Sequence, residues 1–427
     1  MNISQKYFQK TLSGNQILLT IYAAIVCFCT YSCMYAFRKP FTAATYEGLT
    51  VGTIHFKVIL VLSQLVGYTL SKFWGIKFIS EMKRNSRAAT IVVLIGIAAL
   101  SLLLFAITPY PYSAIFMFMN GLPLGMIWGL VFSYIEGRRS TEMIGAVLCV
   151  SFIFSSGFVK RIGKSLMVDH HISEQWMPFA TGMLFLLPML LLIFLLEQIP
   201  PPSAIDIENR VERKPMTAED RSALLKTFLP GIVALVLTYG TLSIMRDLRD
   251  NFIAEIWKEA GLGNVASVFT DTENIISLVV LASIGLMIVI KDNFVALLIN
   301  HGMVALGLML AGGASFLFSQ GSVSAFNWML FAGLGLYLAY VPFNCIFFER
   351  LIAAFKYTAN VGFLMYLSDS FGYLGSLGVL LYKEFGTHDL QWSSFMSTLI
   401  MVVSAIGIVS ISFSFIYFQR KHRTYNV

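Results

Sequence analysis

Charged residues are scarce in this chain, and their scarcity excludes most soluble folds. Only 12% of the 427 residues are Asp, Glu, Lys or Arg, whereas 57% are hydrophobic and the mean hydropathy is +0.74. Soluble domains carry about 25% charged residues. The apolar residues form runs of about 20 along the whole chain, which is the length that a helix needs to cross a bilayer. The composition therefore predicts an integral membrane protein with many spans.

The sequence also lacks the motifs of common catalytic and metal sites. It contains no phosphate-cradling P-loop, nucleophile elbow or HExxH helix, and the adjacent His170 and His171 do not have the spacing of zinc ligands. The five cysteines lie within apolar runs and show neither metal-ligand spacing nor a disulfide framework. We therefore predict a protein that is not an enzyme and that uses no cofactor or metal.

Twelve apolar runs are long enough for membrane helices, six on each side of one polar break. The predicted helices lie near residues 17–38, 54–78, 88–108, 112–135, 142–165, 176–197, 228–250, 267–290, 293–318, 325–348, 356–382 and 391–418. The break begins with three prolines and continues with alternating charges, which favours a linker. We predict an all-α fold with an N-terminal bundle (1–197), a cytoplasmic linker (198–227) and a C-terminal bundle (228–427).

The distribution of Lys and Arg predicts the orientation. With the N-terminus inside, 19 of the 30 basic residues fall on inside segments, as the positive-inside rule requires. Both termini are then cytoplasmic, and the location is the cell (inner) membrane. A basic cytoplasmic rim accounts for the net charge of +7, so no nucleic-acid partner is needed. The expected partners are the lipid bilayer and a small solute, and the expected state is a monomer.

Three basic residues lie inside or at the edge of the apolar runs: Arg38, Lys72 and Arg246. A cation near the bilayer centre costs roughly 2.5–3.5 kcal/mol on insertion scales, so such residues usually face a water-filled cavity on a substrate path. The planar fork of Arg suits a phosphate group, and Lys adds a point charge. Arg38 and Arg246 occupy similar depths in the first helix of each half. The pattern therefore indicates a transporter for an anion bound between two pseudo-symmetric halves.

Each of these cations has a structural alternative. Arg38 could extend from the outer end of its helix to the interface, and Lys72 could do the same at the cytoplasmic end. Arg246 begins the run Arg-Asp-Leu-Arg-Asp, in which Asp247 and Asp250 could neutralise it within a structural network. The sequence leaves these alternatives open.

Acidic residues within the predicted spans could carry a coupling proton or pair with a substrate-site cation. Glu273 in the eighth span and Asp369 in the eleventh are the two candidates, whereas Asp271 is interpreted as an interfacial residue.

Two segments of the N-terminal half resemble a known transporter family. YAFRKPF, from Tyr35 to Phe41, resembles the first-helix motif Y-x-x-R-K-x-F of the organophosphate:phosphate antiporters of the major facilitator superfamily. GYTLSKF, from Gly67 to Phe73, is similar to their second-helix segment with a substrate-site lysine. The resemblance implies that Arg38 binds substrate phosphate and that Lys72 assists.

The C-terminal half carries weaker signs of the same family. Counting back from Trp257 aligns the family's second phosphate-binding arginine with Arg246, and an eighth-helix glutamate falls on Glu273. FGYLG, at residues 371–375, resembles the eleventh-helix signature, and residues 121–128 resemble the glycine pattern of the fourth helix. The resemblance covers most of the chain in patches. The chain also resembles uncharacterised major-facilitator-like bacterial membrane proteins.

The chain departs from that family near the substrate. Phe154 stands where family members carry a fifth-helix histidine, with only Ser155 and Ser156 as polar neighbours. The loop after the second helix, usually Asp-Arg, retains only its charge character as Glu81, Lys83 and Arg84. These departures leave the identity of the substrate open.

We therefore predict a secondary active transporter that moves an anionic, phosphorylated small organic solute by alternating access in exchange for inorganic phosphate. Two alternatives remain. One is a proton-coupled symporter or exporter of another solute, with Glu273 or Asp369 as the proton carrier. The other is a transporter-like sensor that binds a metabolite without moving it.

Overall fold

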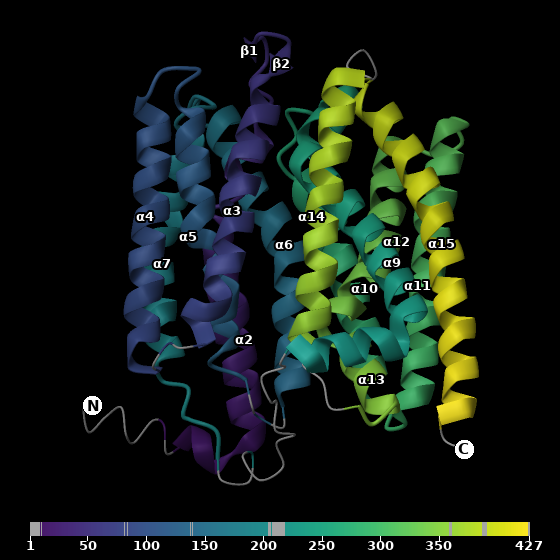
Figure 1. The fold of residues 1–427 in the computed structure, drawn as a ribbon. Coiled ribbons are helices and arrows are strands. Elements are labelled where there is room, and N and C mark those ends of the chain that lie inside the picture. Colours follow the sequence, from purple (N-terminus) through teal and green to yellow (C-terminus); the bar gives the residue numbers. More distant parts are fainter. Residues whose placement is uncertain are drawn as a thin grey trace. The chain divides into compact units, whose positions relative to one another are not determined.

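The computed structural model describes residues 9, 11–80, 82, 84–136, 138, 140–203, 206, 218–357, 361–386 and 391–425. Within them, twelve α-helices have 19 residues or more (Figure 1). Eleven of these are long and apolar enough to cross a membrane, and α3 is the remaining long helix. The prediction of an all-α polytopic membrane protein is confirmed.

The chain divides into two compact units. The first consists of Met1–Arg210 with Ile253–Asp271, and the second of Val211–Phe252 with Thr272–Val427. The first unit contains α2 (Gln16–Tyr35), η1 (Pro40–Ala43), the hairpin β1 (Thr50–Val51) and β2 (Ile54–His55), α3 (Phe56–Ser80), η2 (Arg84–Ser86), α4 (Arg87–Ile107), α5 (Ala114–Phe132), α6 (Thr141–Val168) and α7 (Met177–Leu196). The second is built from α9 (Ala218–Glu259, shared with the first), α10 (Val268–Ile288), α11 (Asn293–Ser319), α12 (Ala325–Cys345), α13 (Phe347–Ala354), α14 (Val361–Gly386) and α15 (Trp392–Tyr425).

Glycines bring helices of the first unit into backbone contact. A Cβ atom on Gly67 of α3 would lie 2.3 Å from the carbonyl oxygen of Phe118 in α5, and one on Gly121 would lie 2.3 Å from that of Gln64. No side chain fits at either position without moving a helix. Lipid provides little hydrophobic drive for helices to associate, so membrane helices depend on such close packing. The α3–α5 contact therefore fixes the position of α3 in its unit.

Glycines also bring α11 and α12 of the second unit into backbone contact. A Cβ on Gly307 would lie 2.4 Å from the carbonyl oxygen of Gly335, and one on Gly335 would lie 2.4 Å from that of Gly307. The helix α15 packs on the other side of α11, where His301 Nε2 lies 3.0 Å from Ser414 Oγ. This core holds α12, which carries several of the residues described below.

The helix ends differ from the predicted ones where charged side chains lie. The prediction placed Arg38 at the end of the first helix, but α2 ends at Tyr35 and Arg38 lies in the following turn. The helix α9 extends to Glu259, beyond the predicted end at residue 250, and its backbone is non-helical at Phe228 and Phe252. Hydropathy identifies apolar length, and it does not detect a turn whose polar groups are satisfied inside the protein.

The start of the predicted linker is held by cations of the first unit. Arg84 donates a hydrogen bond to the carbonyl oxygen of Ile199, and Arg138 donates to that of Pro200. These carbonyls follow the C-terminus of α7, where partial negative charge gathers. Burial lowers the pKa of the Arg138 guanidinium, and the charge of Asp206 opposes this effect. The basic loops thus contribute to the fold as well as to a positive rim.

Candidate functional site

The turn that carries Arg38 is supported by two buried amides. Asn120 Nδ2 on α5 donates to the carbonyl oxygen of Phe37 at 3.0 Å, and Gln64 Nε2 on α3 donates to that of Arg38 at 2.9 Å. Gln64 Nε2 also donates to Asn120 Oδ1 at 2.8 Å. Buried backbone groups that leave a helix need such partners. The two amides therefore allow the chain to leave the helical path and position Arg38.

Arg38 and Lys72 converge on one aromatic ring. The guanidinium carbon of Arg38 lies 3.9 Å from the centre of the Tyr68 ring, and Lys72 Nζ lies 5.3 Å from it. The Tyr35 ring centre is 5.7 Å from the same guanidinium carbon. Both rings are buried, whereas both cations are half-buried. We call Tyr35, Arg38, Tyr68 and Lys72 the Tyr68 cluster.

Aromatic faces attract cations through their quadrupoles and carry no formal charge that would neutralise them. Two like charges near one ring repel each other, and a bound dianion would relieve that repulsion. The Tyr68 cluster is therefore suited to binding a multiply charged anion.

We expect Asn120→Ala to damage the Tyr68 cluster from a distance. The substitution removes the donors to Phe37 and Ala98 and the acceptor of Gln64, which leaves buried polar groups unsatisfied at about 1–3 kcal/mol. Thermal unfolding of the purified protein should show the loss. Ser319→Ala, which removes one exposed hydrogen bond at the end of α11, is the control and should leave the unfolding temperature unchanged. Equal unfolding temperatures for the two variants would contradict this role of Asn120.

Arg246 lies within a hydrogen-bonded network on α9. Its Nε and Nη2 donate to Asp247 Oδ1 at 3.1 and 2.6 Å, and its Nη1 donates to the Tyr340 hydroxyl. Ser376 Oγ donates to the other oxygen of Asp247 at 2.9 Å. The side chains of Arg246 and Asp247 are 18% and 14% exposed. A neighbouring carboxylate thus neutralises Arg246, as in the structural alternative left open by the sequence.

A second carboxylate joins this network through a tyrosine. The Tyr239 hydroxyl donates to Asp369 Oδ1 at 2.5 Å and lies 3.1 Å from the Tyr340 hydroxyl. Together with Arg246 and Asp247 these residues form what we call the Arg246 network. The Arg246 network contains one cation and two carboxylates, so its formal charge is less positive than that of the Tyr68 cluster.

Glu273 forms an ion pair with Arg249. Arg249 Nη2 lies 2.7 Å from Glu273 Oε1, and the two side chains are only 3% and 4% exposed. The same Nη2 donates to the carbonyl oxygen of Met329 at 3.2 Å. A Cβ on Gly333 would lie 2.6 Å from this nitrogen, so only glycine leaves room for the guanidinium. Because the pair is buried and closely packed, we interpret it as an ion pair that stabilises the fold.

The chain matches a family model of unknown function over residues 40–421. This protein belongs to DUF5690. The matched segment spans most of both units and includes Lys72, Arg246, Glu273 and Asp369, whereas Arg38 lies just before it. A search of curated proteins finds no match.

Comparison with solved structures identifies the fold of the DUF5690 chain. The proton:xylose symporter XylE, of the major facilitator superfamily, is 13% identical and superposes with a TM-score of 0.58 over 92% of this chain and 94% of its own. A bacterial homologue of the human drug peptide transporters PepT1 and PepT2 is 12% identical, with a TM-score of 0.60 and coverages of 95% and 99%. The human organic anion transporter MFSD10 (TETRAN) is 13% identical, with a TM-score of 0.56 and coverages of 93% and 98%. The fold is that of the major facilitator superfamily, which confirms the predicted fold class. These matches do not distinguish the antiporter family from other transporters with this fold.

Within the DUF5690 fold, the predicted site residues lie in three clusters. Arg38 and Lys72 share the Tyr68 cluster, Arg246 and Asp369 share the Arg246 network, and Glu273 pairs with Arg249 outside both. The sequence analysis missed the supporting residues, which are Gln64, Tyr68, Asn120, Tyr239 and Tyr340. A helical spacing of four residues links Gln64, Tyr68 and Lys72, and this pattern could have revealed one face of α3.

The position of Phe154 in the DUF5690 chain bears on the substrate. Its ring lies 5.6 Å from that of Phe28 and 5.4 Å from that of Phe158. The neighbouring Ser155 donates to Ser32 at 2.7 Å and is fully buried. Phe154 therefore lies in an aromatic row, next to a buried pair of serines.

Proposed function

We propose that this protein is a secondary active transporter for an anionic, phosphorylated small organic solute, which it exchanges for inorganic phosphate by alternating access. We place it in the cell (inner) membrane as a monomer with both termini in the cytoplasm. Arg38 and Lys72 in the first unit and Arg246 in the second are the residues that we assign to the substrate. The membrane-transporter fold supports the general activity, and the charged side chains support the class of substrate.

The convergence of Arg38 and Lys72 on Tyr68 is the observation that carries the proposal. Arg supplies two parallel N–H donors for phosphate oxygens, and Lys supplies a compact charge. The aromatic row at Phe154 offers no hydrogen-bond partner to a substrate hydroxyl. The organic part of the solute is therefore expected to be less hydroxylated than a sugar phosphate.

Binding of the substrate by Arg246 requires an additional step, because Asp247 already accepts hydrogen bonds from the Arg246 guanidinium. An incoming phosphate with two negative charges competes with this single carboxylate, and Ser376 remains a partner for Asp247 after the exchange. The empty carrier, in contrast, would have to reorient with the charges of Arg38 and Lys72 not balanced by a substrate anion, in an environment of low dielectric constant. This difference favours exchange over one-way leak.

Reconstituted liposomes provide the test of this function. Labelled phosphate should enter phosphate-loaded vesicles at least tenfold faster than empty ones, and an external panel of organic phosphates should drive efflux. Lys258→Gln, which removes a half-exposed cation paired with Glu47, is the control and should transport normally. Equal uptake by loaded and empty vesicles would refute exchange. Binding of a phosphate compound without any flux would favour the sensor.

Proton coupling is the second candidate, and the Arg246 network favours it. Protonation of Asp247 would release Arg246 to a substrate, and Asp369 accepts a hydrogen bond from the Tyr239 hydroxyl in the same network. In this case a protonophore should abolish accumulation of the solute, and Asp369→Asn should make the remaining flux independent of pH. Exchange that survives the protonophore unchanged would favour the phosphate mechanism.

A further inference from the structure

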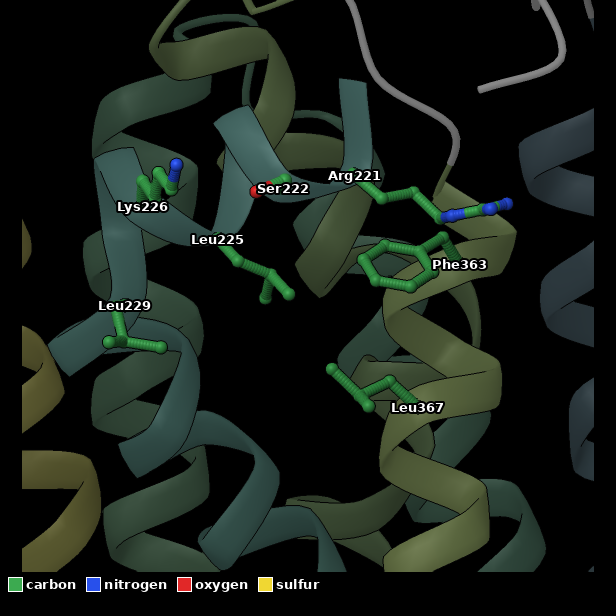
Figure 2. Close-up of a pocket in the computed structure, with 7 residues that line it drawn as sticks. All are labelled: Arg221, Ser222, Leu225, Lys226, Leu229, Phe363 and Leu367. Carbon is green, nitrogen blue, oxygen red and sulfur yellow. The ribbon is translucent and has the colours of Figure 1, made fainter. Parts of the chain in front are cut away.

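A cavity of about 490 Å³ in the second unit lies apart from the Tyr68 cluster and the Arg246 network. Its lining residues come from the start of α9 and the start of α14: Arg221, Ser222, Leu225, Lys226, Leu229, Phe363 and Leu367 (Figure 2). Small-molecule sites span roughly 300–1,000 Å³, so the cavity is large enough for part of a ligand.

The cavity has one cationic end and one apolar end. Figure 2 shows Arg221, Ser222 and Lys226 at the rim, whereas Leu229 and Leu367 lie at the opposite end. On α9, Arg221, Leu225 and Leu229 follow one another at intervals of four residues, so they line one side of the helix. The cavity is therefore shaped for an amphipathic anion.

The sequence of α9 changes from charged to apolar at this cavity, as expected where a helix enters a membrane. The first turn of α9 contains Glu219 and Asp220, and the apolar run of this helix begins at the kink at Phe228. Leu229, just past the kink, is 49% exposed, as expected of a side chain that contacts acyl chains. Polar groups thus lie at the depth of lipid headgroups, and the apolar end of the cavity lies at the depth of the upper acyl chains.

We propose that this cavity binds an anionic phospholipid. Arg221 and Lys226, at opposite sides of the rim, would flank the headgroup and attract its negative charge (Figure 2). Ser222 would donate to a headgroup oxygen, and Leu225, Leu229, Phe363 and Leu367 would contact an acyl chain. Each basic residue near a membrane surface raises the affinity for anionic lipid by about fivefold. This factor sets the loss of affinity expected when such a residue is neutralised. The lipid would stabilise the junction between the start of α9 and the start of α14.

Native mass spectrometry of the full chain in detergent tests the proposal. Titration with phosphatidylglycerol should give one tightly bound lipid, and phosphatidylcholine should bind at least tenfold more weakly. The double variant R221Q/K226Q should lose about 25-fold in affinity for phosphatidylglycerol. The matched control R420Q/R423Q removes two exposed cations from the end of α15 and should bind as the wild type does.

A second pair of variants tests the apolar end without changing charge. Leu367→Trp fills part of the cavity and should reduce lipid binding, whereas Leu381→Trp, at an exposed position of the same helix, should not. Three results would overturn the proposal: equal affinity for the two lipids, equal loss in R420Q/R423Q, or displacement of the lipid by excess inorganic phosphate. The last result would show that the cavity binds soluble phosphate. All three are independent of whether the protein exchanges phosphate.

Discussion

Arg38→Gln should strongly weaken thermal stabilisation by phosphate and organic phosphates and should slow exchange in liposomes. A charge-assisted hydrogen bond contributes about 1.5–3 kcal/mol, so affinity should fall by roughly 10- to 150-fold. Arg38→Lys keeps the charge and loses the planar fork, and it should give an intermediate loss. The measurement is the shift of the unfolding temperature across a ligand titration, because a ligand that binds only the folded state raises stability.

Two controls separate binding from folding in this experiment. Without ligand, Arg38→Gln should unfold within a few degrees of the wild type, because the backbone carbonyls of its turn keep their hydrogen bonds from Gln64 and Asn120. Arg246→Gln should also reduce stabilisation, and a double variant should lose less than the sum of the single losses if both arginines act on one anion. An Arg38→Gln protein with unchanged affinity would remove Arg38 from the site.

Glu273→Ala should destabilise the protein more than any other single change proposed here. It leaves the Arg249 guanidinium buried without its carboxylate, at a cost of about 3–5 kcal/mol. Chemical denaturation in detergent, or the yield of folded protein where unfolding is irreversible, should show the loss. The exposed pair formed by Lys258 and Glu47 is the matched comparison, and Glu47→Ala should cost less than about 1 kcal/mol.

The double variant Arg249→Met/Glu273→Leu distinguishes a structural pair from a coupling residue. Replacement of a buried ion pair by apolar side chains is often neutral or stabilising, so folding should recover. If Glu273 only pairs with Arg249, transport should recover as well. Recovered folding with no transport would instead assign Glu273 to proton coupling.

The sequence predicted the membrane class, the helical fold and the general position of each span, because long apolar runs have few alternatives in a bilayer. It placed Arg38 at the end of the first helix, and the structure places it in the turn after that helix. That turn depends on Gln64 and Asn120, which lie 26 and 83 residues away from the atoms they bind. Contacts at such separations leave no local pattern.

The sequence revealed which charged residues lie within the spans more readily than it revealed which side chains they pair with. Adjacent residues on a helix do not normally face each other, yet the long side chain of Arg246 reaches Asp247. Glu273 was predicted to carry a coupling proton or to pair with a substrate-site cation, whereas its partner is Arg249. Pairing depends on side-chain rotamers and on space such as that at Gly333, and neither can be obtained from one sequence.

The division of α9 between the two units has a consequence for biosynthesis. Residues 253–271 belong to the first unit, where Glu255 accepts a hydrogen bond from Lys57 at 2.7 Å. Lys57 is only 3% exposed, so the unit that is synthesised first must wait for this carboxylate. At about 5–20 residues per second, the ribosome needs several seconds to pass from residue 210 to residue 271. The N-terminal half is therefore completed during translation of the C-terminal half. A gene split in the linker would encode a first fragment whose buried lysine keeps its hydrogen bond to the Thr42 carbonyl and lacks its carboxylate partner.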